Sequence, residues 1–179
     1  LALVVGINSY DDKTLAGLRC AADDAMAVEQ LLVDLGYGPV VLLCDKAASA
    51  DARPTRARFD QALTQLCAAA REQEAAGQGT LLLVYFAGHG TQVAGRPCLL
   101  LQDARQDDPG GTTVPVDDLQ RRLVASTARQ VVVLLDACHC GISATRDLMT
   151  VTDREFVEAV HALAQGFVLI TASTAEQRA

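Results

Sequence analysis

The residues best suited to chemistry lie in two short polar segments, each of which follows an apolar run. His89 stands between two glycines after the run 81–86, and Cys138 stands a few residues after the run 131–135. An imidazole can take up the proton of a thiol, and the thiolate that results is a strong nucleophile. The pair therefore indicates nucleophilic catalysis by a cysteine, if the fold brings the two residues together.

The two apolar runs are the elements that must position this pair. Each is short and bounded by turn residues, which is typical of a strand buried on both faces of a parallel sheet. In such sheets the carboxyl ends of the strands open onto a crevice where ligands bind. Neighbouring strands lie about 4.8 Å apart, so two adjacent strands are expected to set His89 beside Cys138.

The rest of the chain alternates between expected strands and expected helices. Thr55 is expected to cap the second helix, and a hairpin extension over 92–101 is expected to turn at Ala94-Gly95. This alternation predicts an α/β fold, a three-layer sandwich with a mostly parallel sheet covered by helices on both faces. Strands are expected at 1–7, 40–44, 80–86, 130–135 and 167–171, and helices at 18–36, 55–76, 116–124 and 152–164.

Composition limits the classes of partner. The 179 residues suit one domain, half of them are hydrophobic, and the net charge is −7 without a basic stripe. Nucleic acid and an anionic membrane are therefore not expected as partners. No apolar run approaches the roughly 20 residues of a membrane span. Six scattered cysteines predict buried small hydrophobes in a reducing, cytoplasmic compartment.

The segment around Cys138 carries a resemblance to a known family. It reads Asp136-Ala137-Cys138-His139-Cys140-Gly141, and His89 precedes the cysteine by 49 positions. The two motifs resemble those of caspase-like cysteine peptidases, and more closely those of metacaspases and bacterial orthocaspases. Those relatives typically have Asp-x-Cys-His-Ser-Gly here, so Cys140 replaces a serine.

This resemblance implies a caspase-like fold over the whole chain. Residues 1–179 then form a single catalytic domain with strand order 2-1-3-4-5, in which the strands of His89 and Cys138 are neighbours. The domain is expected to lack the family's C-terminal strand and helices. A second chain or a C-terminal continuation is expected to complete the sheet.

The same resemblance implies the roles of the reactive residues. Cys138 attacks a peptide carbonyl to form a thioester acyl-enzyme, and His89 protonates the leaving amine. The backbone N–H groups of Gly90 and Cys138 form the oxyanion hole. The chemistry requires no cofactor, and the substrate is a protein or peptide.

Two acidic residues indicate the preferred substrate. In metacaspases the aspartates that match Asp24 and Asp136 line the primary specificity pocket, and two carboxylates there attract a guanidinium or ammonium group. Cleavage after Arg or Lys is therefore expected, and Arg19 is the nearest candidate for the arginine of animal caspases. Two other roles remain open: stabilisation of a helix start by Asp23 and Asp24, and a turn hydrogen bond for Asp136.

The sequence also suggests two metal sites, one for calcium and one for zinc. Calcium-dependent metacaspases carry an acidic pair where this chain has Asp117 and Asp118, so Ca²⁺ is a possible activator; the alternative is a solvated acidic loop. Cys138-His139-Cys140 also resembles a fragment of a zinc site. Zinc usually requires four ligands, however, and the sequence offers no second close pair. His161 is interpreted as an ordinary helix residue.

Two functional alternatives accompany the peptidase interpretation. A catalytically silent interaction or signalling module can share this fold. A nucleotide-binding enzyme is disfavoured, because no Gly-rich phosphate loop follows the first strand. Self-cleavage after Arg146 or Arg154 is a hypothesis that follows from the basic specificity.

Overall fold

A computed structural model describes residues 1–47, 49–138, 158, 160 and 168–171. Strands and helices alternate along most of the chain, and the third and fourth strands form a hairpin. In chain order they are β1 (Ala2–Gly6), α1 (Ala21–Asp34), β2 (Val40–Cys44), the 3₁₀ turn η1 (Ala50–Ala52), α2 (Arg56–Ala75), β3 (Leu81–Val93), β4 (Arg96–Leu100), α3 (Pro109–Thr112), β5 (Thr113–Pro115), α4 (Val116–Val124), β6 (Gln130–Cys138) and β7 (Val168–Thr171).

The central sheet has the strand order β2-β1-β3-β6-β7, and every neighbouring pair in it is parallel. Strands β4 and β5 form an antiparallel extension that begins at the far end of β3. The predicted order of the five parallel strands and the α/β class are therefore confirmed. The expected hairpin is present as well, and it turns at Ala94 and Gly95, which have φ angles of 50° and 78°.

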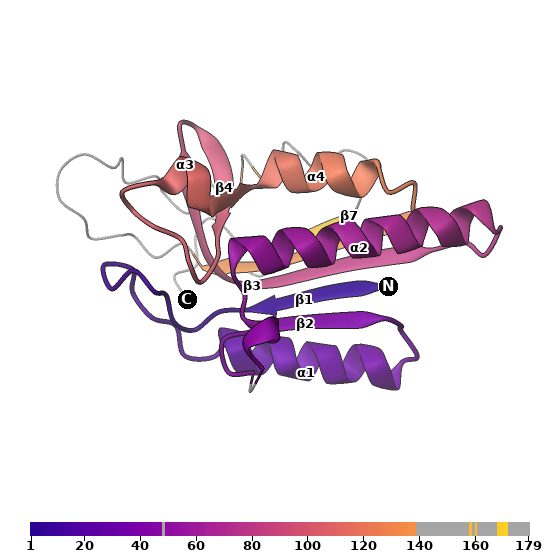
Figure 1. Ribbon diagram of the computed structural model, residues 1–179, viewed down its shortest axis with the longest axis horizontal. Coiled ribbons are helices and arrows are strands. Elements are labelled where there is room, and N and C mark those ends of the chain that lie inside the picture. Colours follow the sequence, from indigo (N-terminus) through magenta and orange to yellow (C-terminus); the bar gives the residue numbers. More distant parts are fainter. Residues whose placement is uncertain (48, 139–157, 159, 161–167, 172–179) are drawn as a thin grey trace.

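Helices cover the two faces of the sheet in different ways (Figure 1). Helix α1 packs small side chains, Ala21 and Ala25, against one face. Helices α2 and α4 lie over the other face and contribute bulky residues such as Phe59 and Leu123. The sheet is thus the middle of three layers, and helix α1 approaches it very closely.

Strands β3 and β6 extend further than the sequence predicted. Strand β3 was expected to end at Phe86 and β6 at Leu135, but they continue to Val93 and Cys138. The two strands stay paired up to His89, and β3 then pairs with β4. These backbone hydrogen bonds keep the glycine-rich segment extended, although glycine disfavours strands. The reactive residues therefore lie within the strands rather than beyond them.

Helix α1 begins at Ala21, three residues after the predicted start. Asn8 holds the preceding segment out of the helix with three hydrogen bonds. Its carbonyl oxygen accepts from the N–H of Leu18 (2.7 Å), its Nδ2 donates to the carbonyl of Arg19 (3.1 Å), and its Oδ1 accepts from the N–H of Ala22 (3.1 Å). The asparagine thus joins the end of β1 to the start of α1.

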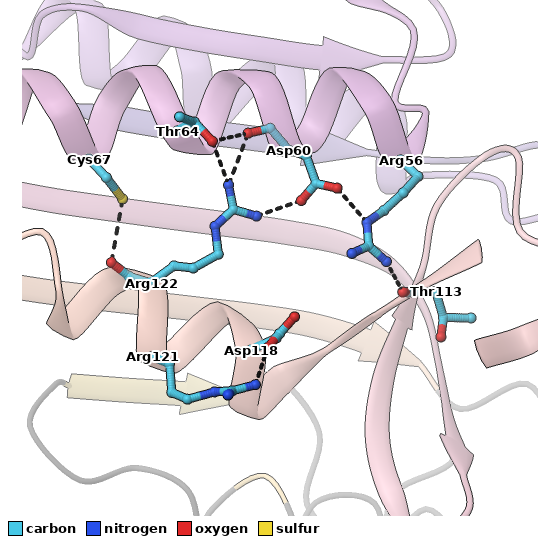
Figure 2. Close-up of polar contacts among 8 residues, drawn as sticks. All are labelled: Arg56, Asp60, Thr64, Cys67, Thr113, Asp118, Arg121 and Arg122. Atoms are coloured by element: carbon cyan, nitrogen blue, oxygen red, sulfur yellow. Dashed lines mark hydrogen bonds and ion pairs between the residues drawn. The ribbon is translucent and has the colours of Figure 1, made fainter. Parts of the chain in front are cut away.

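Polar contacts connect α2 to α4 (Figure 2). Arg122 of α4 pairs with an Asp60 carboxylate oxygen, and it also donates to the Asp60 carbonyl (2.9 Å) and to Thr64 Oγ1 (2.8 Å). The other Asp60 carboxylate oxygen accepts from Arg56 Nε at 2.7 Å, and Arg56 also donates to the Thr113 carbonyl. Both helices on this face are therefore fixed to each other by charge as well as by apolar packing.

No helix in the described ranges is long and apolar enough to cross a membrane.

Candidate active site

The last matched pair of residues between β3 and β6 is His89 and Cys138. The parallel register runs without a break from Leu81 opposite Gln130 to His89 opposite Cys138. Neighbouring strands are about 4.8 Å apart, so the two backbone positions are adjacent at the carboxyl end of the sheet. The structure thus brings together the two residues that the sequence singled out.

The His89 side chain is almost completely buried, with 3% of its surface exposed. Its Nε2 lies 2.8 Å from the carbonyl oxygen of Ala16. A carbonyl oxygen can only accept a hydrogen bond, so Nε2 must carry the proton. In the neutral imidazole the lone pair then belongs to Nδ1, which makes Nδ1 the atom that can exchange a proton during a reaction.

Tyr10 makes two further contacts with His89. The backbone N–H of His89 donates to the Tyr10 hydroxyl at 2.8 Å. The two rings are stacked, with centroids 5.0 Å apart and planes 9° from parallel. Sequence reasoning missed both Tyr10 and Ala16, because the segment 8–17 looks like an ordinary turn-rich loop. A tyrosine within an otherwise small and polar loop was the available signal.

Two carboxylates hold this loop in place. Asp45 Oδ2 accepts from the N–H of Ser9 (2.7 Å), from its hydroxyl (2.7 Å), and from the N–H of Asn8 (3.1 Å). Asp12 accepts from the N–H of Gln106 at 3.0 Å and from both the N–H and the hydroxyl of Thr14. These hydrogen bonds, that from Gln106 first, hold the pKa of Asp12 below its ordinary value.

A second group of residues, formed by Asp24, Asp136 and Tyr85, lies near the same end of the sheet. Asp24 is exposed in the first turn of α1, whereas Asp136 is partly buried in β6. Burial raises the pKa of Asp136, and the negative charge of Asp24 raises it further. Burial, then Asp136 and Asp24, raise the pKa of Tyr85 to about 12. Asp24 therefore lies close enough for its charge to act on Asp136, and both aspartates lie close enough to act on Tyr85.

Asp23, the neighbour of Asp24, has a different partner. Lys46 Nζ lies 2.7 Å from both of its carboxylate oxygens. Both aspartates stand in the first turn of α1, where negative charge stabilises a helix. Both residues therefore have the position that the helix-start interpretation requires, and the charge of Asp24 also raises the pKa of Asp136. Arg19 is exposed, and its carbonyl is held by Asn8.

The model of the caspase domain family, Peptidase C14, matches residues 1–179. The chain belongs to the caspase-domain family. A search among curated proteins found no match. Membership implies a cysteine peptidase that acts on protein substrates, and it agrees with the parallel sheet that carries His89 and Cys138.

In this caspase domain Gly90, the predicted oxyanion-hole residue, is buried in β3 opposite Leu99 of β4. Gly88 has a steric reason to be glycine. A Cβ atom there would lie 2.9 Å from the Phe86 ring and 3.4 Å from the Tyr10 hydroxyl. The chain beside His89 is therefore packed too closely to accept a side chain at position 88 without displacement of its neighbours.

The acidic residues suggested for calcium are engaged with arginine. Asp117 receives two hydrogen bonds of 2.7 Å from Arg96, and Asp118 pairs with Arg121. Among the described residues there is no group of three or more His, Cys, Asp or Glu side chains that could hold a metal ion. A calcium site at Asp117 and Asp118 stays a prediction.

Four cysteines of the caspase domain bear on the prediction that its cysteines are small buried hydrophobes. Burial raises the pKa of Cys44, Cys67 and Cys98, which fits the predicted role of small buried hydrophobes. Cys20 differs, because it is exposed at the start of α1. The remaining sequence hypotheses, which concern His139, Cys140, Arg146, Arg154, His161 and most of the helix predicted at 152–164, lie outside the described residues.

Proposed function

We propose that this caspase domain is a cysteine endopeptidase that cleaves peptide bonds after Arg or Lys, as metacaspases and orthocaspases do. One observation carries the proposal: the register of β3 and β6 sets His89 opposite Cys138. The match to the caspase family over the whole chain supports the same reaction class. The natural substrate is expected to be a protein segment with a basic residue before the scissile bond.

The proposed reaction proceeds in two stages. The Cys138 thiolate, whose proton has passed to His89, attacks the peptide carbonyl, and as the C–N bond breaks the leaving amine takes that proton from His89. The resulting thioester is then hydrolysed by water, which gives its proton back to His89 as the Cys138 sulfur leaves. Because Nε2 is held by the Ala16 carbonyl, Nδ1 is the atom assigned to these proton transfers.

The oxyanion is proposed to accept hydrogen bonds from the backbone N–H groups of Gly90 and Cys138. Such donors are effective because they are fixed before the reaction begins and need not reorganise. Gly90 stands directly after His89 in a strand that is paired with β6 and then with β4. This pairing supports the required rigidity of the backbone.

The proposed preference for Arg or Lys depends on Asp24 and Asp136. The effect of the Asp24 charge on Asp136 supports a pair of neighbouring negative charges, one in the first turn of α1 and one near the end of β6. A cationic side chain is attracted by such a pair, whereas an aspartate side chain is repelled. The partial burial of Asp136 strengthens the effect, because charges interact more strongly away from water.

The alternative is a catalytically silent interaction module with the same fold. Labelling with an arginyl chloromethylketone separates the two, because the reagent alkylates a cysteine only beside a working histidine and a suitable pocket. The peptidase proposal predicts rapid labelling of Cys138 by the arginyl reagent and slow labelling by its aspartyl counterpart. Equal, slow labelling by both reagents favours the silent module.

The direct test is a panel of fluorogenic peptides that differ only in the residue before the scissile bond. Peptides with Arg or Lys are expected to be cleaved, those with Asp are not, and Cys138→Ala is expected to abolish cleavage. Cys20→Ala, which removes an exposed thiol at the start of α1, is the matched control and should retain activity. Cleavage that persists in Cys138→Ala contradicts the proposed nucleophile.

The same panel tests calcium as an activator. Each peptide is assayed with added calcium and with a chelator. If Asp117 and Asp118 form an activating site, the rate rises with calcium and Asp118→Asn weakens the response. Equal rates in both conditions contradict calcium activation while leaving the proposed reaction intact.

A further inference from the structure

One loop, residues 7–20 between β1 and α1, contacts His89 at three different places. The Ala16 carbonyl accepts from Nε2 at 2.8 Å, the Tyr10 hydroxyl accepts from the backbone N–H at 2.8 Å, and the Tyr10 ring stacks on the imidazole. The loop therefore reaches the edge of the ring, its face and the backbone behind it.

These three contacts constrain different motions of the histidine. A hydrogen bond to Nε2 fixes one ring atom, but it allows the imidazole to tilt about that atom. A stacked ring removes the tilt, because its flat face lies within 9° of the imidazole plane. The bond from the His89 N–H to the Tyr10 hydroxyl fixes the chain from which the side chain departs. Tyr10 thus makes two of these three contacts between the loop 7–20 and His89.

Tyr10 is itself held firmly. Its side chain is 3% exposed, its carbonyl accepts from Lys13 Nζ at 3.0 Å, and the adjacent Ser9 is bound by Asp45. A group that is to orient another must not move with it. The burial and the anchoring of the loop satisfy this condition.

We propose that Tyr10 is a positioning residue for the peptidase reaction, holding the plane of the His89 ring through its stacked ring and the His89 backbone through its hydroxyl. The inference rests on the proposed function and assigns Tyr10 no proton transfer. A misplaced base lowers the rate of the chemical steps. Substrate binding depends instead on the pocket of Asp24 and Asp136, which substitution of Tyr10 leaves intact. The effect is therefore expected in kcat rather than in KM.

Two substitutions separate the two contacts of Tyr10. Tyr10→Phe keeps the stacked ring and removes the hydroxyl, whereas Tyr10→Leu removes both. We expect kcat for an arginyl peptide to fall about tenfold in the first and about 100-fold in the second, with KM within about twofold of the wild type. Tyr37→Phe, which removes a hydroxyl just beyond the C-terminal end of α1, opposite the end that carries Asp24, is the matched control and should retain kcat.

A second measurement reads the geometry without any substrate. An aromatic ring shifts the proton resonances of a group stacked on it, so the His89 ring protons are expected upfield in the wild type. The shift should remain in Tyr10→Phe and vanish in Tyr10→Leu. The rate at which iodoacetamide alkylates Cys138 should be highest in the wild type, lower in Tyr10→Phe and lowest in Tyr10→Leu. That reaction needs the imidazole but not the substrate pocket.

The outcomes distinguish this inference from the proposed function. A folded Tyr10→Leu protein with kcat within twofold of the wild type overturns the positioning role, as does a loss confined to KM. If the wild type cleaves none of the peptides, the proposed function fails. The resonance shift and the alkylation rate then decide whether Tyr10 orders His89.

Discussion

The surroundings of three side chains near the site shift their pKa values, two upward and one downward. Tyr85 is neutral at physiological pH, as an ordinary tyrosine is, and burial, Asp136 and Asp24 raise its pKa further, to about 12. Asp136 carries a raised pKa for the same two kinds of reason, and Asp12 a lowered one because N–H groups donate to it. The neutral tyrosine thus leaves Asp24 and Asp136 as the two negative charges of the proposed pocket.

The raised pKa of Asp136 predicts how cleavage depends on pH. As the pH falls toward that pKa, Asp136 takes up a proton, the pocket loses negative charge, and KM for an arginyl peptide rises. Asp24→Asn removes one of the two causes of the raised pKa. Asp136 then stays charged to lower pH, so the rise in KM should move to lower pH. At neutral pH, KM should be about two- to fivefold higher, since one exposed charge is lost.

This prediction is checked by measuring kcat and KM across the acid range for the wild type and Asp24→Asn. Asp34→Asn is the control, because Asp34 is an exposed acid at the opposite end of α1. An unchanged pH profile in Asp24→Asn would show that the two carboxylates do not act on each other during substrate binding.

At the scale of helices and strands, the two layers of helices have different tasks. Helix α1 carries Asp24 and follows the loop that holds His89, whereas α2 and α4 carry none of the residues proposed to contact substrate. The latter pair is joined by Arg122 and Asp60 (Figure 2). The side chains of both residues are only about one-third exposed, at 32% and 36%. Their contribution is therefore expected to exceed that of an ordinary surface ion pair.

Arg122→Met is predicted to lower the free energy of unfolding by about 1–2 kcal/mol, since three hydrogen bonds to Asp60 and Thr64 are lost while the apolar stem is kept. Arg121→Met is a control from the same helical turn. Arg121 is 68% exposed and pairs with Asp118, so its loss should cost less than about 0.5 kcal/mol. Urea unfolding measures both. Equal midpoints for the two variants contradict the assignment, and kcat/KM should be unchanged in each.

At the scale of the whole molecule, the arrangement of the strands could be predicted from the sequence. Continuous apolar runs identify buried parallel strands, and the neighbouring strands of His89 and Cys138 followed from that pattern and the family resemblance. The ends of β3 and β6 were missed because they depend on pairing between distant segments. That pairing overrides the local preference of Gly88 and Gly90 for a turn.

The contacts of the loop 7–20 with His89 were beyond prediction for a related reason. The path of a loop depends on where its hydrogen-bond partners lie in space. Asp45 and Asp12 fix this loop through backbone N–H groups, and no sequence pattern reveals such a contact in advance. Tyr10 and Ala16 therefore acquire their relation to His89 only when the sheet and the loop are assembled.

The close approach of α1 to β1 connects the stability of the whole domain to its proposed activity. A Cβ atom on Gly6 would lie 2.5 Å from the carbonyl oxygen of Ala21 and 2.5 Å from the Cβ of Ala25. Neither atom can yield without a shift of the helix backbone. Gly6→Ala is therefore predicted to lower the free energy of unfolding by about 1–3 kcal/mol. It should also displace the helix that carries Asp24, so KM for arginyl peptides should rise.

Gly110→Ala is the matched control, because a Cβ there meets no atom within 4 Å. Its free energy of unfolding should stay within about 0.5 kcal/mol of the wild type.

Urea unfolding and peptide cleavage together separate a general loss of stability from a displacement of Asp24. Arg122→Met lowers stability alone, whereas Gly6→Ala lowers stability and raises KM, because only the α1 layer carries part of the proposed site. If both variants lose stability and both retain the KM of the wild type, α1 does not place Asp24 for substrate binding.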